Sequence, residues 1–432
     1  MIDSRQLTTK QGLIAISPMI FFILFYFGAS VAAGKFGTVS IPIAFLMASI
    51  YGICIFPSKS IKEKIRIFSR GAGSNNVLLI VWIFFLAGIF SEVAKQTGCF
   101  EETVNMTLNI LPPNYIYAGL FLTACIVSMA TGTALGTVVT LAPIGVELCN
   151  AIGGNMPLTV AIIVGGSFFG DNLSFISDTT IVATSTQECK MADKFKVNLR
   201  IVLPAAIALF FLYIWLGKDL TPIPNDVDVN FVKVLPYAAV ILLALLGINV
   251  MVVLMAGIIA AAVIGMSYGC FDFFGLLSAM NSGLFSMQEV CIIAFLASGM
   301  MEIIKENGGL SFLLDRLSHI IIGKRSAELG IALLVSVANI CTAMNTVAIL
   351  SVSSVAKEIS IKYGLDNRKV ASILDTFSCS VQGLLPYGAH LLVGTSFAGL
   401  STLDIIPYLY YPMLIGISAT IAIIFRLPRK YS

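Results

Sequence analysis

The sequence predicts an all-α polytopic membrane protein made of two inverted repeats. Its composition, its long apolar runs and an internal repetition predict this fold class. Hydrophobic residues make up 58% of the 432 positions and charged residues 11%, whereas a soluble domain carries roughly 25% charged residues. So few charges cannot cover a core of this size in water. The net charge of +3 is also too small for a nucleic-acid-binding protein, so we expect membrane lipid and no nucleic acid as the partner.

Several runs are long enough to cross a membrane, since a membrane helix needs about 20 apolar residues. They are residues 12–31, 38–56, 76–97, 199–217, 232–248, 249–268, 288–306 and 404–426. The first run is longer than the apolar part of a usual signal peptide, so we expect a retained first helix.

Four other apolar stretches are interrupted by polar, Gly-rich residues: 114–150, 157–185, 326–360 and 367–395. Such breaks are tolerated at membrane depth only where protein or a wet cavity covers the backbone. The two arms of 114–150 are each too short for the ~30 Å hydrocarbon core. We therefore expect re-entrant hairpins at 114–150 and 326–360, and broken helices at 157–185 and 367–395.

The chain also repeats itself. Six identities recur 210 residues apart: Phe85, Leu86, Ala87, Glu92, Lys95 and Gly98 match Phe295, Leu296, Ala297, Glu302, Lys305 and Gly308. We expect a first repeat at 1–220 and a second at 228–432, each with about five transmembrane helices, a re-entrant hairpin and a broken helix. Because five crossings is an odd number, the second repeat is inverted, as in many secondary transporters.

The distribution of basic residues fits this crossing order. With residues 57–75 in the cytoplasm, 22 of the 26 basic residues fall on that side, and only Lys35, Lys95, Lys218 and Lys233 do not. The cytoplasmic set includes Lys194, and no Lys or Arg is left inside the membrane. The positive-inside rule then predicts a multi-pass protein of the cell inner membrane with both termini in the cytoplasm.

The densest polar cluster lies in the first broken helix and comprises Asp171, Asn172, Ser174, Ser177, Asp178 and Thr179. On a continuous helix Asp171, Ser174 and Asp178 share one face, and in an unwound segment freed carbonyls join them. Either geometry gathers hard oxygen ligands around a small cation, so these three are Na⁺-ligand candidates. We expect Asp178 to lie deeper and to exchange the proton. The alternative is a buried structural network that caps helix ends.

The two hairpin tips and the second broken helix add further candidates. Thr131, Gly132 and Thr133 at one tip, with Asn345 and Thr346 at the other, are expected to close the ion site. Close helix packing is the alternative at the glycines. Asp375 is the acid expected within the membrane in the second broken helix. His390 is either a proton relay or a hydrogen-bonded structural residue.

The segment Phe169 to Thr180 resembles the signature of the NhaC family of Na⁺/H⁺ antiporters. Residues 131–137 and 374–388 resemble two further stretches of that family, with departures at Leu135, Leu374, Tyr387 and Gly388. The resemblance covers about 75–400. It implies two inverted repeats, and a homodimer as in many members. Its relatives include cation/proton antiporters and also exchangers or importers of organic acids and amino acids.

The expected function is secondary active transport, most simply Na⁺/H⁺ antiport by alternating access. The protein is then not an enzyme and has no cofactor, with Na⁺ and H⁺ as the transported ions. The alternative is a Na⁺- or H⁺-coupled transporter or exchanger of a small carboxylate or amino acid. That substrate calls for a central cationic group or free helix N-termini. An intramembrane protease is disfavoured because G-x-S-x-G and H-E-x-x-H are absent, and inverted halves argue against a channel.

Overall fold

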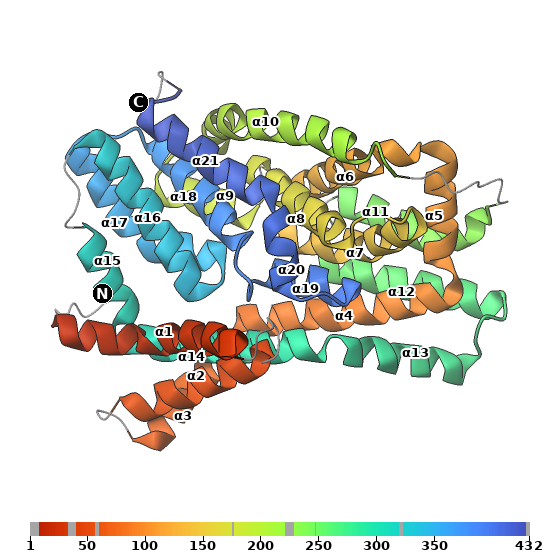
Figure 1. Cartoon of the computed structure of the whole chain (residues 1–432), viewed down its shortest axis with the longest axis horizontal. Coiled ribbons are helices and arrows are strands. Elements are labelled where there is room, and N and C mark those ends of the chain that lie inside the picture. The colour runs from red at the N-terminus through yellow and green to blue at the C-terminus, as the bar shows by residue number, and fades with distance from the viewer. Residues whose placement is uncertain are drawn as a thin grey trace.

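The computed structural model describes residues 8–32, 40–56, 60–174, 177–220, 229–246, 248–318 and 323–428, and within these residues every regular element is a helix (Figure 1). The first half contains α1 (Thr9–Ala32), α2 (Ile41–Ile55), α3 (Ile61–Ala72), α4 (Asn75–Thr97), α5 (Cys99–Ile110), η1 (Pro113–Tyr115), α6 (Ile116–Thr131), α7 (Ala134–Ala151), α8 (Met156–Leu173), α9 (Asp178–Thr186) and α10 (Met191–Leu216). The second half contains α11 (Phe231–Leu245), α12 (Val250–Ser267), α13 (Phe273–Ser286), α14 (Gln288–Glu306), α15 (Gly309–Ser318), α16 (Lys324–Thr342), α17 (Asn345–Tyr363), α18 (Asn367–Gln382), α19 (Ala389–Ala398), α20 (Thr402–Ile405), η2 (Ile406–Tyr408) and α21 (Tyr410–Ile424).

The predicted class of all-α polytopic membrane protein is confirmed. In the described part of the chain eight helical segments are long and apolar enough to cross a membrane, or nine if the pair Ala389–Ala398 and Thr402–Tyr408, bent by 99°, forms one span. Large apolar side chains such as Leu242, Ile259 and Phe274 are exposed on the outside. A protein in water rarely exposes so much apolar surface, whereas lipid tails accept it.

The elements of the two halves follow one another in the same order. The ends of α6 and α16, residues 131 and 342, differ by 342 − 131 = 211. The starts of α9 and α19, residues 178 and 389, differ by the same number, 389 − 178 = 211. Local structure therefore recurs with the sequence repeat, and the inversion of one half relative to the other stays a prediction.

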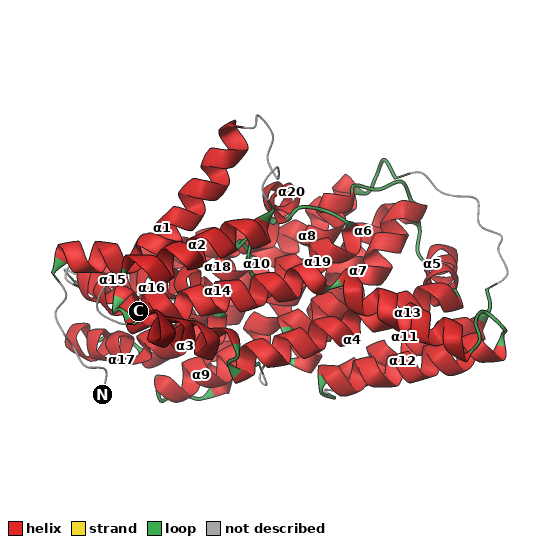
Figure 2. Cartoon of the chain, turned by 90° about the horizontal axis from the view of Figure 1, so that it is seen from below, coloured by secondary structure: helices red, strands yellow, loops and turns green. Residues whose placement is uncertain are grey.

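Both expected hairpins are present as helix pairs, α6 with α7 and α16 with α17. Each turns at one left-handed residue, Gly132 with φ 67° and Ala343 with φ 53°. Gly adopts this conformation without cost, whereas an L-residue pays roughly 1–2 kcal/mol. The two hairpins lie on either side of α8 and α18 in both Figure 1 and Figure 2.

Each hairpin packs its first arm against a broken helix. Gly170 lets α8 approach α6 so closely that a Cβ atom there would lie 2.4 Å from Cβ of Ser128. The Ser128 hydroxyl donates to the carbonyl of Ser167 at 2.5 Å. In the second half Asn339 donates to the carbonyl of Ser378 at 2.6 Å, and both residue numbers are 211 higher. These contacts fix the depth of each break relative to its hairpin tip.

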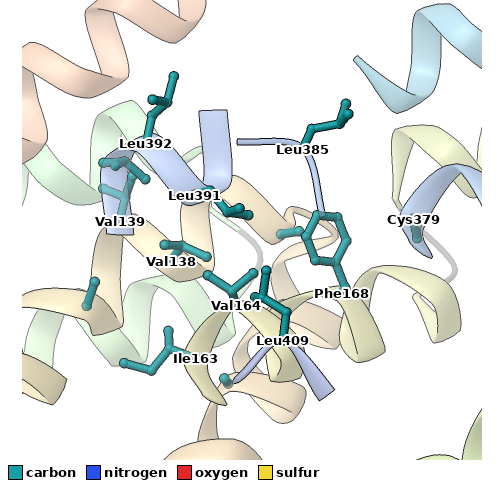
Figure 3. Packing of buried hydrophobic residues seen from close by; sticks show 14 of the residues in the cluster. Val138, Val139, Ile163, Val164, Phe168, Cys379, Leu385, Leu391, Leu392 and Leu409 are labelled. Carbon is teal, nitrogen blue, oxygen red and sulfur yellow. The ribbon is translucent and has the colours of Figure 1, made fainter. Parts of the chain in front are cut away.

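The apolar core behind the first break is shown in Figure 3. Val138 of α7, Val164 and Phe168 of α8, and Leu391 of α19 are all fully buried. Burial of such side chains stabilises the fold by roughly 1.5–3 kcal/mol each. Because this packing involves both halves, it holds the two broken helices against one another.

Candidate ion-binding site

The first broken helix separates the two predicted aspartates into different helices. The helix α8 ends at Leu173, and α9 begins at Asp178 with Ser177 as its N-cap. Asp171 and Asp178 therefore do not share the face of a continuous helix, and the unwound alternative describes this segment. Residues 175–176 within the break lie outside the described residues.

One threonine connects the two carboxylates. The Thr179 hydroxyl donates to Oδ2 of Asp171 at 3.3 Å, and the Thr179 backbone N–H donates to Oδ1 of Asp178 at 3.0 Å. Asp171 also accepts from Sγ of Cys379 at 3.4 Å. The site thus brings Asp171, Asp178 and Thr179 together and adds a residue from α18.

The relative depth of the two aspartates is the reverse of the expectation. Asp171 is 2% exposed, whereas Asp178 is exposed. Asp171 lies on α8, which packs against α6, α7, α10, α18, α19 and α21, while Asp178 begins α9 at the end of the break. Asp171 is thus the more buried of the two carboxylates, which favours it over Asp178 for proton exchange, and the choice between them stays a prediction.

The second hairpin reaches the site directly. The Thr346 hydroxyl donates to Oδ2 of Asp178 at 2.5 Å. The Asn345 side-chain amide lies 3.9 Å from Sγ of Cys379, the same sulfur that contacts Asp171. Both predicted residues of this tip therefore lie beside the aspartates.

The first hairpin touches the break through its backbone. The Ser174 hydroxyl donates to the carbonyl of Met129 at 2.9 Å, so this candidate Na⁺ ligand binds the hairpin in the structure. Thr133 accepts from the Gly136 N–H at 3.2 Å and caps α7. Gly132 forms the turn, and the Thr131 side chain lies outside what the structure describes. The printed contact between this hairpin and the break is thus the one at the Met129 carbonyl, and the closing role of Thr131 to Thr133 stays a prediction.

The remaining polar residues of the break form hydrogen bonds within it. The Asn172 side chain donates to the carbonyl of Phe168 at 2.8 Å. The Ser177 hydroxyl lies 2.7 Å from the Thr179 hydroxyl and accepts from the Thr180 N–H at 3.2 Å. These bonds include the N-cap of α9 by Ser177, as the capping alternative expects, and ion binding by the same oxygens stays a prediction.

Lys194 corrects the sequence analysis. The distribution of basic residues predicts Lys194 at the cytoplasmic surface and no cation inside the membrane, yet the side chain is only 1% exposed. Its ammonium lies 2.7 Å from Oδ2 of Asp375, which is fully buried, and 2.9 Å from the carbonyl of Asn172. Asn198, one turn further along α10, donates to the same Asp375 oxygen at 2.7 Å. The predicted acid Asp375 is thus at the site, held by an ion pair.

The sequence does contain a signal for Lys194 and Asn198. The buried face of α10 continues with Val197, Ile201 and Val202, so both polar residues lie on the apolar stripe at helical spacing. The neighbouring Lys190, Lys196 and Arg200 concealed this stripe, because a run of basic residues usually marks an exposed face.

His390 begins α19 beside the core. Its ring lies 4.6 Å from the ring of Phe168, centroid to centroid, and its Nδ1 has no hydrogen-bond partner among the described residues. Among the described residues nothing binds Nδ1, so this atom supports neither the relay nor the hydrogen-bonded structural role, and both stay open.

Two cavities lie at repeat-related positions of α14 and α4. One of about 270 Å³ is lined by Ser298, Met301, Glu302 and Lys305 of α14, and it reaches Thr342 and Met344 at the second hairpin tip. The other, of about 160 Å³, is lined by Gly88, Ser91, Glu92 and Lys95 of α4, each 210 residues earlier. On α7 this smaller cavity is lined by residues 143, 146 and 147, away from the tip at 132–133. Only the first of these two cavities extends to a hairpin tip.

A membrane-embedded helical fold with polar breaks, hairpins and buried carboxylates defines a secondary transporter. The sequence model of the Na⁺/H⁺ antiporter family matches residues 6–218 and 229–427. The chain belongs to this family.

Characterised relatives are similar over most of their length. The Na(+)/H(+) antiporter NhaC of Bacillus subtilis (strain 168) is 24% identical over 416 residues, which cover 87% of this chain and 88% of that protein. The malate-2H(+)/Na(+)-lactate antiporter of the same strain is 21% identical over 401 residues, or 85% of each protein. Among solved structures the Alcanivorax borkumensis YdaH transporter aligns with 96% of this chain and 99% of its own, at a TM-score of 0.39 and 14% identity.

Proposed function

We propose that this protein exchanges Na⁺ for H⁺ across the cell inner membrane by alternating access, with both termini in the cytoplasm. The observation that carries this proposal is the pairing of Asp171 and Asp178 across the break through Thr179. Two carboxylates at membrane depth are costly unless protonated, paired or bound to a cation. A site that alternates between protons and Na⁺ meets that requirement in both halves of the cycle.

The roles of the two aspartates follow from their surroundings. Asp171 is buried, so its ionised form is penalised and a proton or a cation must neutralise it. Asp178 is exposed and contacts the second hairpin through Thr346. We assign proton exchange to Asp171 and the first contact with the incoming cation to Asp178. Asn172, Ser177, Thr179 and Thr346 supply neutral oxygens around them.

Access to Asp178 is best supported from the side of the larger cavity. Its lining includes Thr342 and Met344, which precede Thr346 on the second hairpin. The smaller repeat-related cavity does not extend to its hairpin tip. A cavity that reaches the second hairpin tip, while its repeat-related counterpart does not reach the first tip, fits alternating access. The homodimer implied by the family resemblance stays a prediction.

The test is proton movement in proteoliposomes that carry a lumenal pH dye, after a jump in external Na⁺. Asp171→Asn and Asp178→Asn should each abolish Na⁺-dependent proton movement in folded protein, because an amide cannot exchange a proton. Asp366→Asn is the matched control. Asp366 caps α18, and although burial alone would raise its pKa, hydrogen bonds and the charge of Arg368 hold that pKa below the ordinary value. Wild-type exchange in both purified Asn variants of the site would refute the assignment.

Coupled transport of a small carboxylate is a second candidate, and Lys194 favours it. An organic anion calls for a buried cation, and the structure supplies one where the sequence analysis expected none. The similarity to the malate-2H(+)/Na(+)-lactate antiporter points in the same direction. Against this, the Lys194 ammonium is engaged by Asp375, Asn172 and Thr180. External malate or lactate in the same assay separates the two functions, since only the second responds to them.

A further inference from the structure

The ammonium of Lys194 has all three of its hydrogen-bond donors engaged. It lies 2.7 Å from Oδ2 of Asp375, 2.9 Å from the carbonyl oxygen of Asn172 and 2.7 Å from the hydroxyl of Thr180. A lysine ammonium has three N–H groups and no acceptor, so this set satisfies it fully. The side chain is 1% exposed, and water therefore takes little part in the arrangement.

The three partners come from the three segments that form the site. Asn172 lies at the end of α8, Thr180 in the first turn of α9, and Asp375 in the middle of α18. The carbonyl of Asn172 is one of the last carbonyls of its helix, which lack a partner within the helix and carry the negative end of its dipole. Lys194 thus holds both sides of the first break to the second broken helix.

The three oxygens that bind the ammonium are also of the kinds that coordinate a free cation. Broken-helix transporters coordinate Na⁺ with unwound carbonyls and half-helix C-termini, and hard cations prefer carbonyl, hydroxyl and carboxylate oxygens. The ammonium carries the same unit charge as Na⁺. A carboxylate oxygen of the same set, Oδ1 of Asp375, has no hydrogen-bond partner among the described residues, so an unused lone pair remains at the site.

We propose that the ammonium of Lys194 is a tethered cation that fills a second monovalent-cation site, formed by Asp375, the Asn172 carbonyl and the Thr180 hydroxyl. This site is distinct from the position between Asp171 and Asp178 and is filled by the chain itself. A free Na⁺ binds there when the lysine side chain is removed. The inference deepens the proposed function and rests on it only in taking Na⁺ as the cation that the break accommodates.

A second buried ion pair provides a matched control. Lys369 lies 2.9 Å from Glu328, and the side chains are 2% and 3% exposed. This pair joins the first turns of α18 and α16 rather than the break. Removing either lysine leaves a buried carboxylate uncompensated, which is strongly destabilising. At Lys194 the carbonyl at the end of α8 and the Thr180 hydroxyl remain to bind a replacement cation.

The experiment measures the melting temperature of purified protein in detergent while NaCl rises a hundredfold, with choline chloride keeping the ionic strength constant. The samples are wild type, Lys194→Met, Lys369→Met and the double variant Lys194→Met/Asp375→Asn. We expect both single variants to melt several degrees below wild type at low Na⁺. Na⁺ should raise the melting temperature of Lys194→Met more steeply than that of wild type, because it binds two sites in the variant. Lys369→Met and the double variant should follow the wild-type slope.

Several results would overturn the inference. They are a wild-type slope for Lys194→Met, an equally steep slope for Lys369→Met, or a steep slope that persists without the Asp375 carboxylate. If Lys194→Met fails to fold in high Na⁺ while the double variant folds, Na⁺ does not replace the ammonium, and the inference is also wrong. If the proposed Na⁺ exchange is wrong, the melting temperature of wild type itself does not respond to Na⁺, and this outcome is distinguishable from failure of the inference.

Discussion

Gly170→Ala should disrupt the site from one step away, through the contact between α8 and α6. The added Cβ would lie 2.4 Å from Cβ of Ser128 and 2.6 Å from the backbone nitrogen of Met129, far inside normal contact distance. Because one of these atoms is backbone, the helices must separate. Separation strains or breaks the Ser128–Ser167 and Ser174–Met129 hydrogen bonds, of 2.5 and 2.9 Å. Overpacking costs about 1–3 kcal/mol and each of the two hydrogen bonds about 1 kcal/mol, so we expect a loss of about 3–5 kcal/mol when both bonds break.

Thermal unfolding in detergent and Na⁺-dependent proton movement in proteoliposomes check this prediction together. Since Gly170 directly precedes Asp171, transport should fall even in protein that remains folded below its melting point. Gly28→Ala is the matched control, because a Cβ there meets no atom within 4 Å. That substitution should be neutral or stabilising by up to about 1 kcal/mol. A Gly170→Ala protein with wild-type melting temperature and wild-type transport would show that the close approach of α6 and α8 does not position the site.

Three further predictions concern the second hairpin, the topology and a helix contact. Thr346→Val removes the hydroxyl bound to Asp178, a hydrogen bond to a charged group of about 1.5–3 kcal/mol, so the half-saturating Na⁺ concentration should rise about tenfold or more; an unchanged value would exclude this tip from the site. Cysteines substituted for Arg66 and Lys218 should differ in labelling by an impermeant reagent in intact cells, with only position 218 labelled. The reverse pattern would mean that the topology is opposite to the predicted one. Tyr237→Phe removes a buried hydrogen bond from α11 to a carbonyl of α7 and should lower the unfolding free energy by about 1 kcal/mol, whereas no loss would mean that the bond contributes nothing net.

The sequence was sufficient for the fold class and for the positions of the breaks. A polar, Gly-rich stretch such as 170–180 inside an apolar run can be recognised from the local sequence alone, because lipid penalises every unpaired backbone group at that depth. The helix ends at Leu173 and Thr342 accordingly lie within the interruptions expected from residues alone. The pairing of hairpin arms also followed from sequence, since a short connection leaves two adjacent helices few alternatives.

Only the tertiary structure decided how the candidate residues meet. Ser174 has the right chemistry for a Na⁺ ligand, yet its hydroxyl binds the carbonyl of Met129, a partner 45 residues earlier that no spacing rule identifies. The relative depth of Asp171 and Asp178 likewise depends on which helices cover α8. Composition and spacing describe a segment, whereas burial depends on its neighbours.

Lys194 shows most clearly what the sequence determines and what only the tertiary structure decides. By sequence it is one of several basic residues at the start of a helix, and the positive-inside rule assigns all of them to the surface. In the fold, the first turn of α10 lies against the break, and Asp375 from the other half of the chain compensates the ammonium at 2.7 Å. The sequence by itself determined that charges would be scarce within the membrane. Which charge is buried was decided by tertiary packing, because a buried ion is stable only where a distant part of the chain supplies its partner.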